Sequence, residues 1–553
     1  MNHRYRDTPP KLRTMALMLG LLAIALVWLT MTDYGVASDV GNYFGSSLRQ
    51  LAWAREFFEN LRLGRPTAAL EKDTVFEYWR WYLPRIPHPP LSRELGGLTW
   101  FLTHRWLDAL TAYRLAVMLS YGVLVGWVAV FTFWAARSRL AGLIAGLAAL
   151  SYPALFAHGH LAHTDLFLTT FWFIGAAAMA IYVRTLGVGW LVAAGLLLGA
   201  AAATKFTGVL LAPVLVFWLL VRRPSHAAGI VILAGVAVAT FFAVNPVLWV
   251  APKVGLADYL GAGIGRASGE MTRLRTEYFG RIYEFRPPWH YVWVWSAVVL
   301  PPSFMIAIAA AIMRLKQNWI IPFCLLNMGV LYAALLLPSA PMHDGIRLLL
   351  PVLPFQCVLV GIGGMRLIDF LESRLADTAR PWLESLVVVA LIVPAAASSV
   401  RIHPYQLSYV NLLVGGVSGA EAKGLEVTNL KEVFSRRVLA DLDLMIPDGA
   451  VVDPGFLTEE MCFYQAQGFA RTWTAETQLT REGGRSGEAL ACVSTEISPV
   501  LLNRKAREPD WVFVLNRKAV WRPVDRALFL YGGPPAYEIS VDGVPLFRAY
   551  RTR

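Results

Sequence analysis

The stretch RLAVMLSYGVLVGWVAVFTFWAA at residues 114–136 decides the fold class, because after its first arginine it contains no charged residue. A helix of about 20 apolar residues crosses the roughly 30 Å hydrocarbon core of a membrane. Similar runs, each bounded by charges or turn formers, recur up to residue 400. They predict an all-α polytopic membrane bundle of about eleven transmembrane helices. We place these near residues 15–31, 114–136, 140–157, 165–183, 188–203, 206–221, 227–248, 291–313, 318–337, 347–365 and 382–400.

The composition agrees with a membrane location. Of the 553 residues, 56% are hydrophobic and 16% are charged, whereas ordinary globular chains have about 25% charged residues. The formal net charge is +12, but the basic residues occur as scattered pairs between apolar runs and form no continuous face for a nucleic acid. No small-residue cleavage site follows the first run, so we expect a retained signal anchor. Membrane lipids, and no nucleic acid, are the expected surroundings.

The orientation follows from the basic residues at the ends of the runs, because cytoplasmic loops carry an excess of Lys and Arg. The turns at residues 158–164 and 338–345 carry neither, so they face the outer side. An odd number of spans then puts the C-terminus outside a cell (inner or cytoplasmic) membrane, on the periplasmic or extracellular side. The cytoplasmic ends are marked by Arg4, Arg6, Lys11, Arg13, Arg137, Arg139, Arg184, Arg222, Arg223, Arg314, Lys316 and Arg366.

Residues 1–400 are expected to form the transmembrane domain, with large outer loops at 33–111 and 251–290. Loops of this length seldom serve only as connections. Apolar residues at helical spacing in 48–61 and 91–110 predict two helices that lie in the membrane interface.

Residues 401–553 predict a separate soluble α/β domain of a common domain size. The runs DWVFVL (510–515) and PLFRAY (545–550) have the composition of strands, and LKEVFSRRVLADL (430–442) has helical periodicity. No nucleotide-binding glycine loop is present.

The four cysteines show no metal-binding spacing. Cys324 and Cys357 lie inside apolar runs, whereas Cys462 and Cys492 lie in the polar C-terminal part. In an oxidising compartment the latter two could form a disulfide, but the sequence is equally consistent with two free thiols.

Asp39, in TDYGVASDVGNYF (32–44), lies directly after the first apolar run. A carboxylate at the outer membrane boundary can act as a general base toward an acceptor hydroxyl. The alternative is an interfacial Asp that is simply solvated.

A second acid, Asp165, lies in AHGHLAHTDLFL (157–168), where ionisable groups are costly and tend to be functional. The neighbouring His158, His160 and His163 could be metal ligands, but their i, i+2, i+5 spacing does not place all three on one helical face. A divalent metal ion therefore remains an open alternative.

Two cations, Lys205 in AAATKFTGVLLAP and Arg347 in PMHDGIRLLLPVLP, lie at the outer ends of apolar runs. Both could bind a phosphate, for which Arg offers a fixed fork of donors. Lys205 could instead reach back to the interface, and Arg347 could form an internal ion pair with Asp344. In PRIPHPPLSREL (84–95), His88 precedes two prolines that fix an extended entry into the next helix.

Taken together these segments resemble the glycosyltransferase C superfamily, and within it the branch of protein O-mannosyltransferases and the aminoarabinose transferase of lipid A. The resemblance spans nearly the whole chain. Its residues are Asp39, HPPL (88–91), Asp165 in HTDLFL, TKFTG around Lys205, EYFGRIYEFRPPWHY (277–291), MHDGIRLLLPVLP (342–354), HPYQLSYVNLLVGG (403–416) and VDGVPLFRAY (541–550).

The resemblance implies an inverting transfer of a sugar from a polyprenyl-phosphate donor. Asp39 would be the base that activates the acceptor, Asp165 a second acid near it, and Arg347 with Lys205 the groups that bind the donor phosphate. It adds Arg93 to the groups that bind the donor phosphate, and His88, His343, Tyr283 and His290 as other site candidates.

Two departures from the family pattern concern substrate specificity and metal binding. Many relatives have an Asp-Glu pair in the first loop, but Val40 follows Asp39 here, and Leu348 stands where an aromatic residue usually follows the late Arg. The missing Glu removes any metal-linked role that it would have.

The expected function is a membrane glycosyltransferase that acts at the outer face on a lipid, glycan or protein hydroxyl. A transporter or flippase for lipid-linked sugars would also use intramembrane charges, but the ionisable residues here cluster at one face and the two halves of the chain differ. A non-catalytic scaffold would not need so many spans. Neither the sugar nor the acceptor follows from the sequence.

Overall fold

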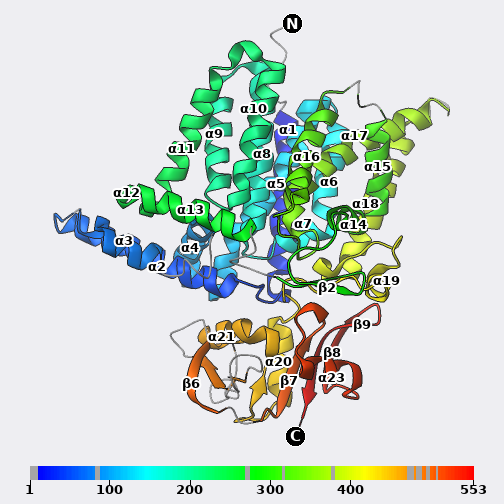
Figure 1. Cartoon of the computed structure of the whole chain (residues 1–553). Helices are drawn as coiled ribbons and strands as arrows, with labels where there is room; N and C mark the ends of the chain where they lie inside the picture. Colours follow the sequence, from blue (N-terminus) through cyan, green and yellow to red (C-terminus); the bar gives the residue numbers. More distant parts are fainter. Residues whose placement is uncertain are drawn as a thin grey trace.

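The computed structural model describes residues 10–65, 67–80, 88–267, 274–313, 315, 318–374, 380–469, 479–480, 488–492, 499–505 and 508–552. Of residues 479–480, 488–492 and 499–505 it describes the backbone. Figure 1 shows a helical bundle with the N-terminus at one end and a sheet-containing region, which carries the C-terminus, at the other. The cytoplasmic markers Arg4, Arg6, Arg314 and Lys316 lie outside the described residues.

Each predicted apolar run is helical in the described part of the chain, although Pro153 divides the run at 140–157 into two helices. The bundle helices are α1 (Pro10–Leu29), α5 (Ala109–Ala136), α6 (Arg139–Ser151), α7 (Pro153–His158), α8 (Thr164–Thr185), α9 (Val188–Ala202), α10 (Leu211–Arg222), α11 (Gly229–Ala243), α14 (Tyr291–Val298), α15 (Pro302–Ile312), α16 (Ile320–Leu336), α17 (Leu353–Glu372) and α18 (Arg380–Arg401). The 3-10 turns η3 (Phe206–Leu210) and η6 (Arg347–Val352) precede α10 and α17.

The described helices confirm a polytopic, mostly helical membrane protein. Four segments are long and apolar enough to cross a membrane, a bent pair of helices adds a fifth, and six further apolar helices are shorter. The total of about eleven spans remains a prediction. Within the bundle α8 is central, since 94% of its apolar stretch is buried, compared with 28% for the last helix, α18.

The run at 291–313 is broken into α14 and α15, which meet at 111°. The break contains Pro301, which cannot donate a helical hydrogen bond. The side chain of Asn411 donates to the carbonyls of Ala297 at 2.7 Å and Leu300 at 3.0 Å. Backbone groups released by the break therefore stay hydrogen-bonded, as a low-dielectric environment requires.

Small residues allow α1 to pack closely against α5. A Cβ atom added at Gly122 would lie 2.8 Å from the carbonyl oxygen of Gly20, and one at Gly126 would lie 3.1 Å from that of Ala16. Close approach at such four-residue spacing is typical of helix pairs in membranes. It fixes the first helix, and hence the chain segment that leaves it, against the bundle.

Several elements lie between the bundle and the C-terminal region (Figure 1). The helices predicted in 48–61 and 91–110 are observed as α2 and α4, with Phe58, Leu98 and Leu102 exposed, and their place in the membrane interface remains a prediction. Leu110, however, belongs to α5. The reason is Asp108, whose carboxylate accepts from the Thr111 amide and starts α5 there. The elements are α2 (Val40–Arg62), α3 (Lys72–Trp79), α4 (Leu91–Thr103), α12 (Pro246–Val250), α13 (Pro252–Ala267), β1 (Thr276–Tyr278) and β2 (Arg281–Tyr283).

In the described C-terminal region, seven strands form a mixed sheet in the order β6-β5-β4-β3-β7-β9-β8. Strand β3 pairs parallel with β4 and β7, and the other pairs are antiparallel. The strands predicted within 510–515 and 545–550 are observed as β7 and β9. The elements are α19 (Gly416–Ala422), α20 (Arg436–Met445), β3 (Val452–Asp453), α21 (Thr458–Ala466), β4 (Leu479–Thr480), β5 (Glu488–Cys492), β6 (Pro499–Lys505), β7 (Trp511–Leu515), η10 (Lys518–Val520), α23 (Pro523–Tyr531), β8 (Tyr537–Val541) and β9 (Val544–Arg551).

The helix predicted at 430–442 begins later than its periodicity suggested. Residues 430–435 are not helical, and α20 starts after Ser435, whose side chain accepts from the Val438 amide. Lys431 has a φ of +67°, which a right-handed helix does not allow. We call residues 424–435 the strap, because this non-helical segment lies along the part of the chain that leaves the first span.

Cys462 is disulfide-bonded, whereas the sequence was consistent with either a disulfide or a free thiol at this position. Cys324 and Cys357 are free and buried. The side chain of Cys492, the remaining cysteine, lies outside the described part of the chain.

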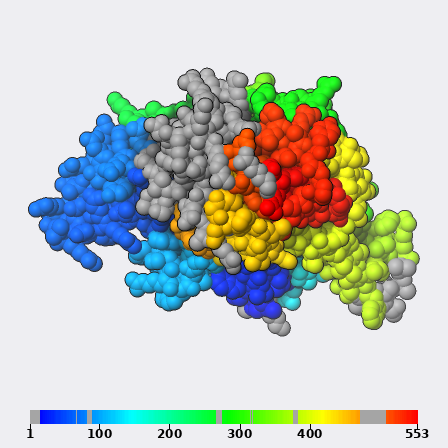
Figure 2. All heavy atoms as spheres, turned by 90° about the horizontal axis from the view of Figure 1, so that it is seen from below, coloured from blue at the N-terminus to red at the C-terminus, as the bar shows by residue number. Residues whose placement is uncertain are grey.

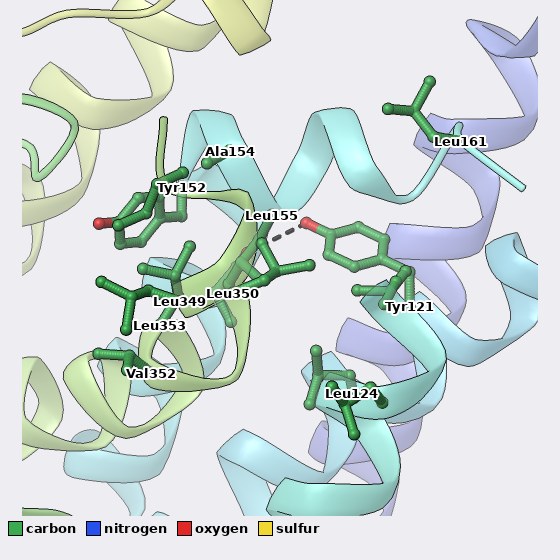
Figure 3. Packing of buried hydrophobic residues seen from close by; sticks show 14 of the residues in the cluster. Tyr121, Leu124, Tyr152, Ala154, Leu155, Leu161, Leu349, Leu350, Val352 and Leu353 are labelled. Atoms are coloured by element: carbon green, nitrogen blue, oxygen red, sulfur yellow. Dashed lines mark hydrogen bonds between the residues drawn. The ribbon is translucent and has the colours of Figure 1, made fainter. Parts of the chain in front are cut away.

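The apolar core anchors the turn that carries Arg347. Figure 3 shows Leu349, Leu350 and Val352 of η6 packed beside Tyr152 and Leu155. On the other side of this cluster the Tyr121 hydroxyl donates to the Ala149 carbonyl at 3.0 Å. Since all of these side chains are buried, η6 is held rigidly at the end of the bundle nearest the C-terminal region.

Candidate functional site

Asp39 lies at the start of α2, on the chain that leaves the first span. Its φ of +68° places it in the left-handed region, and its carboxylate makes no capping hydrogen bond to α2. The side chain is 44% exposed, and the ion pair recorded for it is with Arg347, at 4.0 Å from Oδ2 to Nη2. A strained backbone at a partly open carboxylate is a combination found at functional sites.

Asp165 is the opposite case, a buried carboxylate between two cations. It is the second residue of the central helix α8 and is 2% exposed. Oδ1 accepts from the Lys205 ammonium at 2.6 Å, and Oδ2 accepts from Arg347 Nε at 2.9 Å. Two cations thus share this one buried carboxylate.

Arg347 is the centre of the cluster, and every nitrogen of its guanidinium has a partner. Nε donates to Asp165, Nη1 donates to Asp344 at 2.9 Å, and Nη2 donates to His163 Nδ1 at 2.8 Å. Because Arg can only donate, His163 must accept through Nδ1 and carry its proton on Nε2. Each terminal nitrogen bears two protons, so one N–H on each of Nη1 and Nη2 remains beyond these contacts.

The pair Asp344 and His343 extends the cluster away from the bundle. Nδ1 of His343 lies 2.9 Å from Asp344 Oδ2, and the C-terminal region supplies Arg517, which donates to Asp344 Oδ1 at 2.7 Å. Burial would raise the pKa of Asp344, but His343, Arg517 and Arg347 hold it well below its usual value. Asp344 is therefore ionised throughout the physiological pH range.

A small pocket lies beside Asp39, between the segment that follows α1 and the C-terminal region. It is lined by Val36, Asp39, Gly41 and Asn42 on one side and by Glu459 and Glu460 of α21 on the other. Figure 2 shows the yellow, orange and red atoms of the C-terminal region from the centre of the face to its right, and the blue segment after α1 projecting at the left. The C-terminal region thus forms part of the wall around Asp39.

His88 lies one aromatic ring away from the cluster, and Arg93 lies in the helix that follows His88. The His88 ring packs edge-on against Tyr43 at 6.3 Å, and Tyr43 packs in turn against His163 at 5.8 Å. Arg93 is buried in α4. The start of α4 is joined to the segment before Lys205 by a hydrogen bond from the Leu91 amide to the Ala203 carbonyl, at 3.1 Å.

Tyr283 and His290 belong to the neighbouring hairpin and its exit. His290 is hydrogen-bonded to the Tyr278 hydroxyl at 2.6 Å, and Tyr283 is partly buried against the core. Among the described residues neither of them makes a hydrogen bond or ion pair with Asp165 or Arg347. The structure brings Asp39, Asp165, Lys205, Arg347 and His343 together, and it leaves Tyr283 and His290 outside this group.

The three histidines of the turn before α8 do not converge. His158 Nδ1 contacts the Ala154 carbonyl at 2.8 Å, His160 Nε2 contacts the Thr30 hydroxyl at 2.8 Å, and His163 binds Arg347. Within the described ranges, no group of three or more His, Cys, Asp or Glu side chains could hold a metal ion. The donor set expected for a divalent metal is therefore not found in these residues.

Sequence reasoning missed Arg517 and gave His163 a different role. Nothing in the sequence around Arg517 distinguishes it from the other basic residues of a charged region. For His163 the signal was its position two residues before Asp165, which places both side chains at the start of one helix. The ion pair of Arg347 with Asp344, which the sequence offered as the alternative to phosphate binding, is observed.

The fold defines a class, that of helical membrane bundles with interfacial helices and a sheet-containing region at one end. No family model and no curated protein sequence matches the chain. Among solved structures, the fold is similar to that of ArnT from Cupriavidus metallidurans bound to undecaprenyl phosphate, with 15% identity, 96% of this chain and 97% of that chain covered, and a TM-score of 0.50. The apo ArnT structure covers 97% and 98% at 15% identity, with a TM-score of 0.47.

At this identity the likeness to ArnT establishes the fold, not the reaction. The chain thus has the fold of ArnT over nearly its whole length. The resemblance to the superfamily branch that includes the aminoarabinose transferase, predicted from sequence motifs, is confirmed at the level of the fold.

Proposed function

We propose that this chain is a membrane glycosyltransferase that moves a sugar from a polyprenyl-phosphate donor to an acceptor hydroxyl at the outer face of the membrane. One observation carries the proposal: a half-exposed carboxylate, Asp39, lies 4.0 Å from an arginine that three further side chains hold in place. The likeness in fold to an ArnT structure bound to undecaprenyl phosphate supports a donor of this chemical class.

In this reaction Asp39 acts as the base. Its carboxylate takes the proton of the acceptor hydroxyl as the oxygen attacks the anomeric carbon of the sugar. The bond between that carbon and the phosphate oxygen breaks at the same time, and the bonding electrons leave with the phosphate. A single displacement of this kind inverts the configuration of the anomeric carbon.

Arg347 and Lys205 stabilise the departing phosphate. The two terminal nitrogens of Arg347 each have an N–H beyond the contacts that orient it, and a guanidinium matches phosphate oxygens well. In this arrangement Asp165 orients the two cations, because both of its oxygens are already occupied by them. Preorganised positive groups of this kind act where negative charge develops in the transition state.

The test is the Asp39→Asn variant, assayed in membranes with a panel of undecaprenyl-phosphate sugars and a broad acceptor mixture. We expect the rate of transfer to fall about 10²- to 10⁴-fold, the usual contribution of a general base, while binding of the donor persists.

Asp33→Asn is the matched control. Asp33 is 45% exposed, close to the 44% of Asp39, but it binds His403 at 2.8 Å and makes no ion pair with Arg347. Equal rates in the two variants, or no transfer from any polyprenyl-phosphate sugar by the parent protein, would overturn the proposal.

A further inference from the structure

Arg517 reaches the candidate site from the far end of the sequence. It follows strand β7 of the C-terminal sheet and is 2% exposed. Its Nη2 donates to Asp344 Oδ1 at 2.7 Å, its Nε lies 3.4 Å from Glu426 Oε1, and its Nη1 donates to the Asn429 carbonyl. A buried arginine with this many partners has a fixed position.

The contact between Arg517 and Asp344 affects the charge balance around Arg347. Two buried carboxylates touch that guanidinium, Asp165 through Nε and Asp344 through Nη1. Lys205 binds the other oxygen of Asp165, and Arg517, which also lies near Glu426, binds the other oxygen of Asp344. Without Arg517, Arg347 alone would balance the negative charge of Asp344. The positive charge of Arg347 would then attract a phosphate less strongly.

The geometry of Asp344 also supports a link between Arg517 and Arg347. It has a φ of +55°, so it is held in the left-handed region that non-glycine residues seldom adopt. Its two oxygens face two different arginines, Oδ1 toward Arg517 and Oδ2 toward Arg347. One carboxylate therefore joins an arginine of the C-terminal sheet to an arginine at the end of the bundle.

The strap holds the Asp39 side of the site in a similar way. The Gly35 amide donates to the Glu432 carbonyl at 2.7 Å, and the Ser38 amide donates to the Leu430 carbonyl at 2.9 Å. A Cβ atom at Gly35 would lie 2.3 Å from the Phe434 carbonyl oxygen, so the two segments touch directly. The chain that carries Asp39 is thus bonded by its backbone to the C-terminal region.

Building on the proposed function, we infer that the C-terminal region is part of the transfer site, and that Arg517 is a positioning residue that keeps Arg347 available for the donor phosphate through Asp344. The alternative is a structural ion pair that only joins the two regions. Charge compensation makes a distinguishing prediction: removing the Asp344 charge should relieve the loss of Arg517.

The experiment measures the dissociation constant of undecaprenyl phosphate for the full-length protein in nanodiscs, together with its thermal unfolding midpoint. Arg517→Gln should weaken binding about 10- to 100-fold. The double variant Arg517→Gln with Asp344→Asn should recover most of that loss, because the uncompensated carboxylate is gone.

Arg522→Gln is the matched control in the same region. Arg522 forms ion pairs with Asp453 at 2.9 Å and Asp525 at 2.7 Å, and within the described part of the chain it forms no ion pair with Asp165, Asp344 or Arg347. We expect this variant to lower the unfolding midpoint while it changes donor binding less than twofold. If Arg517→Gln does not fold, Arg517→Lys and Arg522→Lys give the same comparison, with about fivefold weaker binding expected for the first alone.

Equal binding by the Arg517 and Arg522 variants, or no recovery in the double variant, would overturn this inference and leave the proposed function standing. The Arg347→Gln variant distinguishes failure of this inference from failure of the proposed function. If that variant also bound undecaprenyl phosphate as well as the parent protein does, the proposed function itself would fail.

Discussion

The regions around Asp39 and Asp165 place two carboxylates near one arginine in opposite environments. Asp39 is 44% exposed and 4.0 Å from Arg347, whereas Asp165 is 2% exposed and hydrogen-bonded to both Arg347 and Lys205. A carboxylate with open oxygens can accept a proton, and one whose oxygens are both bound to cations cannot do so without breaking those bonds. Residue type and proximity are the same, so the environment decides the role.

The largest expected effect comes from neutralising the buried member of the pair. Asp165→Asn leaves Lys205 and Arg347 buried without their shared counter-charge, which typically costs about 3–5 kcal/mol of stability. Asp39→Asn should change the stability by less than about 0.5 kcal/mol, as surface substitutions do. Denaturation midpoints in detergent provide the measurement, and equal midpoints for the two variants would contradict the comparison.

A smaller effect is expected when the arginine between the two acids is changed to lysine. Arg347→Lys keeps the charge, but a single ammonium cannot bind Asp165, Asp344 and His163 at once. The loss of the fork should raise the KM for the polyprenyl-phosphate donor about 10- to 50-fold. Lys205→Arg, which keeps both the charge and the ability to reach Asp165, should change KM less; the opposite ranking would assign the phosphate to Lys205.

The third and smallest effect uses a buried carboxylate that forms no ion pair among the described residues. Glu432, in the strap, is 2% exposed, and within the described part neither of its oxygens has a hydrogen-bond partner. Burial raises its pKa to about 7, so the folded protein holds a proton that the unfolded chain releases near pH 4.5. Stability from this group is therefore complete below about pH 4.5 and declines as the pH rises toward and past 7.

Glu432→Gln mimics the protonated form at every pH. It should raise the free energy of unfolding by about 1–2 kcal/mol at pH 8 and by little at pH 5. Thermal unfolding at both values measures the difference, with the exposed Glu459→Gln as a control expected to show none. A gain that is the same at pH 5 and pH 8 would rule out titration of Glu432 as its cause.

The same contrast of environments explains what the sequence could reveal. Asp39, Asp165, Lys205 and Arg347 were identifiable because a charge at the edge of an apolar run is rare and costly, and a topology of alternating spans brings such edges together. Arg517 was not identifiable, because a charged residue in a polar region is ordinary and its partner Asp344 lies far away in the sequence. The roles of all five residues remain predictions.

The errors in the predicted secondary structure have local physical reasons. Residues 430–435 have a helical pattern, but their carbonyls bond to the Gly35 and Ser38 amides, so tertiary contacts override propensity. The run at 291–313 is helical on both sides of Pro301, but the sharp bend at this proline was not anticipated. Leu110 was assigned to an interfacial helix because apolar spacing continues past the cap at Asp108. Periodicity located the helices well and their ends poorly.

The bond between Arg517 and Asp344 has a consequence for biosynthesis. The ribosome adds residue 517 after every helix of the bundle has been made. The bundle of a nascent chain can therefore be inserted before Arg517 is available to bind Asp344 beside Arg347. If the proposed function holds, such a chain would bind a polyprenyl-phosphate donor weakly until the last strands had folded. The order of translation would then delay activity until residue 517 had been added and folded. A chain terminated before that residue would be inserted but inactive.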